Sequence, residues 1–452
     1  MHPAKISIFN SRIHMANTEK EEPDMTDSLN RRQFVKGATT AAAAGYVVKT
    51  GVALAQDAPS SRVRVGVMGL SRGKSLALTF GGRSGVEVAC AADVDINRAK
   101  AGGAAIEKAG GKAPEVVQDF RRILDNKDID VLVCAAPNHW HAPATILGCA
   151  AGKHVYVEKP CSHNPNEGEL MIKAARKHNR AVQMGTQRRS SPSITEAMQL
   201  LWDGEIGRVY HANSWYGNAR GPIGKGLAAP VPDFLQYDQW QGPAPRVAYY
   251  DNRIHYNWHW FWHWGNGELG NNGIHALDLC RWGLQVDYPN RIVSAGGRYR
   301  FDDDQQTPDT HNVAFEFEGR KSMAWDGMSC NRHRNDFVTF YGEDGAMSID
   351  GGGNCTFYAG ATDKVKKEVK GNKGDVEHIE NFVAAIRNDK PLELNQEILS
   401  GHKSTLLCHL GNIAHRTGRT LNCSTEDGHI IGDDKAMKLW QREYEPGWEP
   451  QV

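Results

Sequence analysis

Short apolar stretches alternate with segments of helical character over the first part of the chain that follows residue 61. Residues 63–68 and 86–92 are apolar and rich in β-branched side chains, and a glycine-containing turn at 69–73 follows the first stretch. This order predicts a strand, a turn, a helix and a second strand, which together form one βαβ unit.

The same pattern continues to about residue 184. Residues 129–135 predict another strand, 142–151 a helix and 154–157 a further strand. Strands that alternate with helices indicate a parallel, doubly wound sheet. We therefore expect an α/β Rossmann domain over residues 56–184.

Beyond residue 184 the texture changes to longer polar loops and alternating strands. Residues 312–317 alternate between polar and apolar, and 336–349 have the pattern of two strands joined by a tight turn. Two helices are predicted, at 376–388 and 396–417. These features predict an α+β domain over 185–452 with a large, mostly antiparallel open sheet.

The first 55 residues have the pattern of an export signal. The pair Arg31-Arg32 precedes a weakly apolar run at 37–48 and the small-residue triplet Ala53-Leu54-Ala55. An amphipathic surface helix is the alternative interpretation. We expect a twin-arginine signal peptide over 1–55, cleavage after Ala55 and a periplasmic mature protein.

Composition narrows the class of partner. The chain has 53 Lys plus Arg against 53 Asp plus Glu, and no apolar run of about eighteen residues interrupts it. Its nine cysteines show neither C-x-x-C nor zinc-site spacing, which predicts buried apolar residues and no metal site. We expect a small-molecule ligand, no nucleic acid and no membrane association after export.

Glycines stand where the first strand turns into a helix, which is where backbone amides can hold a pyrophosphate. Counted from Gly69 as G-x-G-x-x-G, the second and third glycines are replaced by Ser71 and Lys74. A plain βα turn is the alternative. The candidate cofactor-binding residues of this turn are Gly66, Gly69, Ser71, Arg72 and Gly73.

Asp93 strengthens the dinucleotide interpretation. It follows Gly69 by 24 residues, at the end of the second predicted strand, where a carboxylate can accept hydrogen bonds from a ribose diol. A carboxylate there repels a 2′-phosphate, so the sequence favours NAD as the cofactor. NADP remains possible because Arg98 is close in sequence.

Five motifs resemble the Gfo/Idh/MocA oxidoreductases, which are named for glucose-fructose oxidoreductase and inositol dehydrogenase. The resemblance covers nearly the whole mature length, and its most specific element is Glu158-Lys159-Pro160. The matching segments are 130–133, 137–141, 152–160, 273–275 with Asp278, and 381–387.

The resemblance implies roles for particular residues. Lys159 and His275 match the catalytic lysine and histidine of the family, Asn138 and His141 fall on the loop that lines the cofactor, and Glu158 falls beside the nicotinamide. It also implies that the open sheet carries the substrate and often an oligomer contact, so a homo-oligomer is expected.

The chemistry agrees with these roles. Oxidation of a hydroxyl needs a base for its proton, which suits a histidine of pKa near 6.5, and an ammonium group stabilises the developing alkoxide. Taken alone, His275 would be a structural histidine and Lys159 a surface charge. Where the family commonly has an aspartate this chain has Asn271, which cannot take a proton; we expect it to be a polar substrate contact.

Four tryptophans alternate along the aromatic segment 255–264. In an extended conformation they share one face, and His263 lies on the other. Such a surface suits a sugar ring, but an aromatic core strand is an equal alternative. The loops at 187–189 and 217–232 complete or cover the cleft in the first case, with Arg189 and His263 as candidate substrate contacts.

Together these features predict an NAD(P)-dependent oxidoreductase that oxidises a hydroxyl of a sugar, glycoside or polyol. Because no dinucleotide pool is expected outside the cytoplasmic membrane, the cofactor should stay bound and be recycled in place. Two alternatives remain open at this point. One is a redox-neutral lyase, hydrolase or epimerase that uses transient oxidation, and the other is a non-catalytic sugar-binding protein with the same fold.

Overall fold

The computed structural model describes residues 62–333 and 336–452. The expected signal peptide, 1–55, with its cleavage site after Ala55, lies outside the described residues and stays a prediction.

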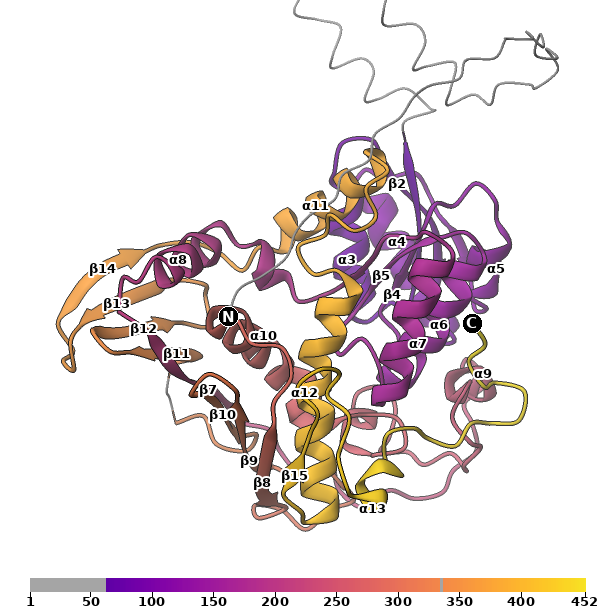
Figure 1. Cartoon of the computed structure of the whole chain (residues 1–452). Coiled ribbons are helices and arrows are strands. Elements are labelled where there is room, and N and C mark those ends of the chain that lie inside the picture. The colour runs from indigo at the N-terminus through magenta and orange to yellow at the C-terminus, as the bar shows by residue number, and fades with distance from the viewer. Residues whose placement is uncertain (1–61, 334–335) are drawn as a thin grey trace, which may run out of the picture. The chain divides into compact units, whose positions relative to one another are not determined.

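The first sheet is wholly parallel and confirms the expected Rossmann domain (Figure 1). Its strand order is β3-β2-β1-β4-β5-β6, the doubly wound order in which ligands bind at the carboxyl ends of the strands. The strands are β1 (Val63–Met68), β2 (Val86–Ala92), β3 (Glu115–Val117), β4 (Val131–Cys134), β5 (His154–Val157) and β6 (Val182–Met184). The helices between them are α3 (Arg72–Gly81), α4 (Ile96–Lys108), α5 (Arg121–Asp125), α6 (Asn138–Ala150) and α7 (Pro165–Lys177).

Continuous burial explains why these strands are apolar along their length. All four residues of β4 are fully buried, and so are Val65 and Val67 of β1, because helices cover both faces of the sheet. The carboxyl ends of β1, β2, β4 and β5 therefore bring the segments after residues 68, 92, 134 and 157 to one edge of the sheet.

The second sheet has nine strands in the order β14-β13-β12-β11-β7-β10-β9-β8-β15. Only the β7–β10 pair is parallel, which confirms the mostly antiparallel sheet. Its strands are β7 (Val209–Gly217), β8 (Arg291–Gly297), β9 (Thr310–Phe317), β10 (Lys321–Met328), β11 (Val338–Gly342), β12 (Gly345–Ile349), β13 (Cys355–Ala359), β14 (Val365–Val369) and β15 (Leu421–Asn422). In Figure 1 they follow one another from β14 at the left to β15 at the lower centre.

Helices of the second domain pack on this sheet and on each other. Helix α10 contacts β7, and α12 contacts both β8 and α10. The two helices expected at 376–388 and 396–417 are confirmed to within two residues. The elements are α8 (Pro192–Trp202), α9 (Tyr237–Gln241), α10 (Ile274–Leu284), α11 (Asp375–Arg387), α12 (Ile398–Thr417) and α13 (Asp434–Met437), with 3-10 turns η2 (Gln187–Ser190) and η3 (Asn257–Trp260) and a π-helical turn η4 (Leu269–Gly273).

The aromatic segment 255–264 is not a strand, so the prediction that its tryptophans share one face of an extended chain is wrong. The Trp258 indole donates to the His255 carbonyl and the His259 ring contacts the Tyr256 carbonyl, which replaces a sheet ladder by local hydrogen bonds. Trp264 packs edge-to-face on Trp240 in a separate small core. The alternation of tryptophans thus serves a compact turn.

One buried ion pair joins three elements of the second domain. Both carboxylate oxygens of Asp278, on α10, accept from the Arg189 guanidinium of η2, at 2.9 and 3.0 Å. Ser404 and Gln396 donate to the same carboxylate from α12 and the segment before it. Burial acts to raise the pKa of Asp278, but Arg189 together with Arg281 and Ser404 outweighs it and holds that pKa below its usual range.

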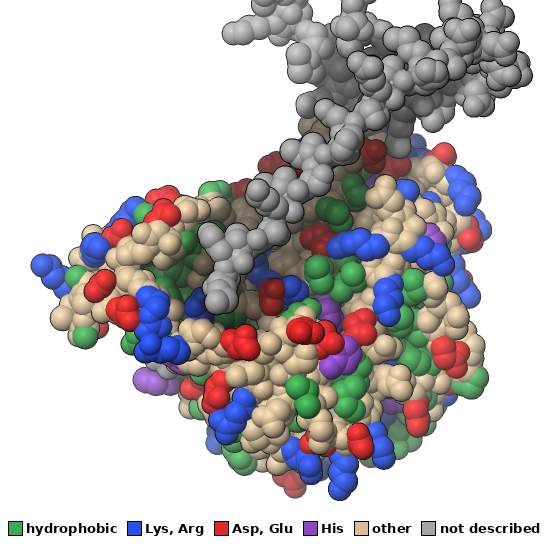
Figure 2. All heavy atoms as spheres, viewed as in Figure 1, with side chains coloured by type: hydrophobic (Ala, Val, Ile, Leu, Met, Phe, Trp, Pro, Cys, Tyr) green, Lys and Arg blue, Asp and Glu red, His purple; other side chains and the backbone are tan. Residues whose placement is uncertain are grey.

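Helix hydropathy, surface charge and the state of the cysteines can be read directly from the structure. Within the described ranges, no helix is long and apolar enough to cross a bilayer. Acidic and basic side chains are interspersed over the face shown in Figure 2. The nine cysteines are unpaired, and all but Cys330 are buried.

Removal of the buried charge should destabilise the protein strongly. We expect Asp278→Asn to lower the free energy of unfolding by about 3–5 kcal/mol, because it leaves the Arg189 guanidinium buried without its partner. Urea unfolding followed by tryptophan fluorescence measures this change. Glu343→Gln is the matched control, since its pair with Arg208 is exposed and should contribute about 1 kcal/mol or less. Equal effects of the two substitutions would contradict the role assigned to Asp278.

Candidate active site

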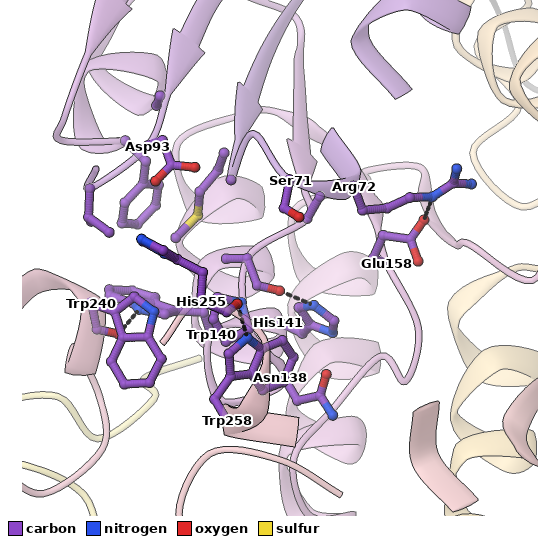
Figure 3. A pocket seen from close by; sticks show the side chains of 18 of the residues that line it. Ser71, Arg72, Asp93, Asn138, Trp140, His141, Glu158, Trp240, His255 and Trp258 are labelled. Atoms are coloured by element: carbon purple, nitrogen blue, oxygen red, sulfur yellow. Dashed lines mark hydrogen bonds and ion pairs between the residues drawn. The ribbon is translucent and has the colours of Figure 1, made fainter. Parts of the chain in front are cut away.

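A cavity of about 500 Å³ lies at the carboxyl ends of the parallel strands (Figure 3). The turns after β1, β2, β4 and β5 line one side of it, and the aromatic residues Trp240, Tyr256 and Trp258 of the second domain line the other. Its lining includes predicted site residues from both domains, among them Ser71 of the first domain and His275 of the second.

The turn after β1 is built for close approach of a ligand to the backbone. Gly69 has φ +87°, and a Cβ there would stand 2.6 Å from the Ala135 carbonyl oxygen, so only glycine fits. Helix α3 follows with no side chain capping its N-terminus. Ser71 and Arg72 line the cavity beside these free amides, an arrangement suited to a pyrophosphate.

Two of the expected phosphate-turn glycines serve packing instead. Gly66 lies within β1, where a Cβ would overlap the Ile123 side chain at 2.4 Å. Gly73 lies inside α3, where a Cβ would stand 2.9 Å from Val67. Neither lines the cavity, and both allow close contact of the helices and the sheet.

Asp93 is at the cavity wall directly after β2. Its carboxylate accepts from the backbone amides of Leu70 at 2.7 Å and Asp95 at 3.0 Å, which fixes its position. A carboxylate has about four acceptor sites, so capacity for a ribose diol remains. Burial raises the pKa of Asp93, although these amides oppose the shift.

Asn138 and His141 both line the cavity from the start of α6. The Asn138 amide donates to the Asn266 side chain at 3.0 Å. The His141 ring lies between two carbonyl oxygens, of Pro160 at 2.5 Å and Ala136 at 2.7 Å. A neutral imidazole has one N–H and donates to one of these carbonyl oxygens, so His141 links the loops after β4 and β5.

Glu158 is buried at the end of β5 and pairs with Arg72 at 3.2 Å (Figure 3). Arg72 also lies 3.3 Å from Asp375 at the start of α11. Burial works against the charge of Arg72, but Glu158 outweighs it and raises the pKa of the guanidinium. This pair joins the phosphate turn to the strand that carries Lys159.

The structure brings Lys159 and Asn271 into direct contact. The Lys159 Nζ donates to the backbone oxygen of Asn271 at 2.7 Å and to its side-chain oxygen at 3.0 Å. Burial lowers the pKa of Lys159, while Glu158 and Glu268 act in the opposite direction. Asn271 therefore orients the ammonium group, a role that an amide oxygen can fill without exchanging a proton.

His275 lies in the same cavity with a free ring. Its Nδ1 is buried without a hydrogen-bond partner, and no described residue bonds to the ring. Burial lowers its pKa well below 6.5, and the positive charges of Lys159, Arg188 and Arg72 add to the shift. The imidazole is thus neutral near pH 7 and can accept a proton.

A second cavity, of about 830 Å³, adjoins the first. The two share the lining residues Gln187, His275 and Lys373, so His275 stands at their junction. The second cavity extends over the large sheet, where Trp215 and Tyr216 of β7 line it. These rings form the aromatic wall of the second cavity, whereas residues of the 255–264 segment line the first.

Two of the expected substrate contacts are placed elsewhere. Arg189 is committed to Asp278 inside the domain core and lines neither cavity. The His263 Nε2 contacts the Pro245 carbonyl at 2.8 Å, and its ring packs on Trp264. Neither side chain supports the expected role, because each is held by structural partners away from both cavities.

Sequence reasoning missed two charged residues near the site. Arg188, next to Arg189, lines the second cavity. Glu268 is buried in an ion pair with Arg220 at 2.7 Å and accepts from Asn271 at 3.4 Å. Its place three residues before Asn271, in a glycine-rich turn, is the only signal in the sequence that could have pointed to it.

Comparison with known proteins agrees with this architecture. Residues 63–186 match the Gfo/Idh/MocA model described as "Oxidoreductase family, NAD-binding Rossmann fold". Residues 213–450, more than half of the chain, match the model described as "Oxidoreductase family, C-terminal alpha/beta domain".

Individual relatives match over shorter lengths. Inositol 2-dehydrogenase of Salmonella typhimurium is 30% identical over 158 residues, which cover 35% of this chain and 45% of that protein. Levoglucosan dehydrogenase of Pseudarthrobacter phenanthrenivorans is 34% identical over 98 residues, which cover 22% of this chain and 25% of that protein. The chain thus aligns with less than half the length of these curated relatives.

A solved structure matches over most of the fold. The aldose-aldose oxidoreductase of Caulobacter crescentus, in complex with glycerol, superimposes with a TM-score of 0.62 and 21% identity. The match covers 80% of this chain and 99% of that one. At this identity the likeness establishes the fold alone. The two family matches establish that the chain belongs to the Gfo/Idh/MocA family of oxidoreductases.

Proposed function

We propose that this protein is an NAD-dependent oxidoreductase that oxidises a hydroxyl group of a sugar, glycoside or polyol. The observation that carries the proposal is the position of His275, an unpartnered and neutral imidazole at the junction of two cavities. One cavity has the features of a dinucleotide site, and the other has aromatic and polar walls suited to a carbohydrate.

The residues present fit NAD. Gly69, Ser71 and the uncapped start of α3 would hold the pyrophosphate, and Asp93 would accept from a ribose diol. Asn138 and Glu158 line the end of the cavity nearer to Lys159 and would flank the nicotinamide. Bound NAD would supply the acceptor for a hydride from the substrate carbon.

The proton chemistry belongs to His275 and Lys159. The neutral His275 ring accepts the proton of the substrate hydroxyl, and the Lys159 ammonium donates a hydrogen bond to the same oxygen as negative charge develops. Lys159 reaches this position because Asn271 accepts two of its hydrogen bonds. The third ammonium proton remains for the substrate.

Glu268 supplies the negative charge that Asn271 lacks. Its carboxylate is buried, hydrogen-bonds to the Asn271 amide and raises the pKa of Lys159 against the effect of burial. It is compensated by Arg220 on its other side. We therefore assign Glu268 to positioning and charge balance, with no proton transfer of its own.

Export remains part of the proposal on the strength of the arginine pair and cleavage triplet in residues 1–55. A periplasmic enzyme has no free dinucleotide pool to draw on, so we propose that the cofactor stays bound and is reoxidised in place.

Incubation of the purified protein with a panel of sugars, glycosides and polyols tests the function. Reduction of bound NAD, with an oxidised product by mass, supports it. A protein that neither contains nor binds dinucleotide contradicts it, and a redox-neutral product would reassign it to transient oxidation.

Substitution of Lys159 or His275 should lower turnover strongly and spare cofactor binding. We expect Lys159→Ala to lower kcat by about 100- to 1000-fold and His275→Ala by about 100- to 10,000-fold, since each removes one part of the proton chemistry. Nicotinamide content and steady-state rates measure the two properties separately. His211→Gln is the control, because that half-buried ring lies outside both cavities. Near-normal rates in both alanine variants would remove these residues from the mechanism.

The pH profile of kcat/KM should be bell-shaped. His275 must be neutral and its pKa lies below 6.5, so activity rises with pH through a value below 6.5. Lys159 must be protonated and its pKa lies below 10.5, so activity falls through a value below 10.5. Initial rates across the pH range, with the cofactor saturating, give both limbs. An acid limb centred above 6.5 would show that His275 is not the neutral base.

Asp93→Asn should weaken NAD binding by about tenfold, because one charged acceptor for the ribose diol becomes an amide. The affinity for NADP should change less, since the substitution also removes repulsion of the 2′-phosphate. Fluorescence titration of the two dinucleotides measures the ratio. Asp128→Asn, at an exposed carboxylate outside the cavity, is the control. An unchanged ratio would separate Asp93 from cofactor selection.

A further inference from the structure

The wall of the second cavity contains a buried arginine without an ionic partner. Arg188 is 8% exposed, and its guanidinium lies 4.4 Å over the Phe337 ring. Its Nη2 donates to the Gly351 carbonyl at 2.8 Å, while its Nη1 is buried with no hydrogen bond. Among the described residues no carboxylate lies within ion-pair distance of it.

Two other arginines near the site, the buried Arg189 and the half-buried Arg220, are different. Arg189 is paired with Asp278, and Arg220 with Glu268. In the case of Arg220, burial is outweighed by Glu268 and the pKa of the guanidinium rises. In the case of Arg188, burial dominates and the pKa falls. A buried charge left in this state is costly unless something else supplies the opposite charge.

Lys373 adds a second positive charge to the same wall. It lies just before α11, its side chain is exposed, and it makes no hydrogen bond or ion pair with a described residue. Like His275 it lines both cavities, so its ammonium group stands on the path between them.

Arg332, whose side chain is exposed, is a third basic residue that lines the second cavity. Neither acidic lining residue forms an ion pair with Arg188 or Lys373. Asp350 accepts from the backbone amides of Gly352 and Gly353, both at 2.8 Å, and from the Asn354 side chain. These donors hold it within its own turn. Asp336, the other acidic lining residue, is exposed and forms no ion pair with a described residue.

We propose, building on the function proposed above, that the substrate is a sugar acid whose carboxylate binds to Arg188 and Lys373 while its hydroxyl lies at His275. A carboxylate carries one charge and matches the planar donors of a guanidinium. Asp336 and Asp350 already place negative charge at the cavity, which disfavours a doubly charged phosphate there. Asp350 acts on Arg188 only from beyond ion-pair distance, so a neutral sugar would leave the Arg188 guanidinium without a direct ionic partner.

Paired ligands test this inference on the NAD-loaded protein. Glucuronate is compared with glucose, galacturonate with galactose, and glucose 6-phosphate serves as the phosphate probe. Calorimetry gives affinity, and the absorbance of reduced nicotinamide gives turnover. We expect each acid to bind at least about tenfold more tightly than its neutral partner.

The variants Arg188→Gln and Lys373→Gln should reduce the preference for the acid by about 10- to 100-fold. Lys370→Gln is the matched control, three residues from Lys373, paired with Glu368 and outside both cavities. If Arg188→Gln fails to fold, Lys373→Gln decides the matter, because its side chain is exposed.

The outcomes separate this inference from the function on which it rests. Neutral sugars that reduce the nicotinamide as well as the acids do would leave the dehydrogenase intact and overturn the sugar acid. A preference for glucose 6-phosphate, or a preference for acids that both variants retain, would overturn it as well. Bound NAD that no sugar of either class reduces, in a protein that still binds the acids through Arg188, would instead overturn the proposed oxidation.

Discussion

The buried pair of Arg189 and Asp278 determines where the chemistry of this protein can occur. Asp278 is three residues after His275 on α10, and Arg189 follows Arg188 directly on η2. The bidentate contact between them, reinforced by Ser404, therefore fixes the imidazole and the cavity-lining guanidinium relative to one another. Desolvation of two charges is expensive, and it is offset here because every carboxylate oxygen has a donor. The benefit is positional, since a single ion pair anchors two groups on separate elements.

Charge around His275 is unbalanced in a way that bears on its chemistry. Lys159, Arg188 and Lys373 all disfavour an imidazolium ion there, and no carboxylate of the described residues bonds to the ring. At the position where the family commonly has an aspartate, this chain has the uncharged Asn271. The nearby Glu268 is already paired with Arg220. The neutral imidazole is consequently a weak base while the cavity holds no anion. Negative charge on a substrate would offset the effect of these cations on His275, which would raise the pKa of the imidazole and make it a stronger base.

Much of the fold could be predicted from the sequence, because burial on both faces leaves continuous apolar strands and burial on one face leaves alternation. The strands β1, β2 and β9 and the helices α11 and α12 carry those patterns clearly. The aromatic segment 255–264 did not, because period-two tryptophans are also compatible with a turn whose rings pack on a neighbouring core. Periodicity describes one strand or helix at a time, and that turn is stabilised by contacts with Trp240.

The candidate site shows the same division between local and tertiary information. Gly69, Asp93, Lys159 and His275 occupy positions relative to strand ends and helix starts, so motif spacing was enough to bring them to one cavity. Arg188 and Arg189 are adjacent in one short turn, and nothing local distinguishes them. Arg189 pairs with Asp278, some ninety residues further along the chain, and its guanidinium lies in the core. Arg188 lines the second cavity instead. The arginine that lines the second cavity is thus distinguished from its neighbour by the neighbour's pairing with a carboxylate in the core.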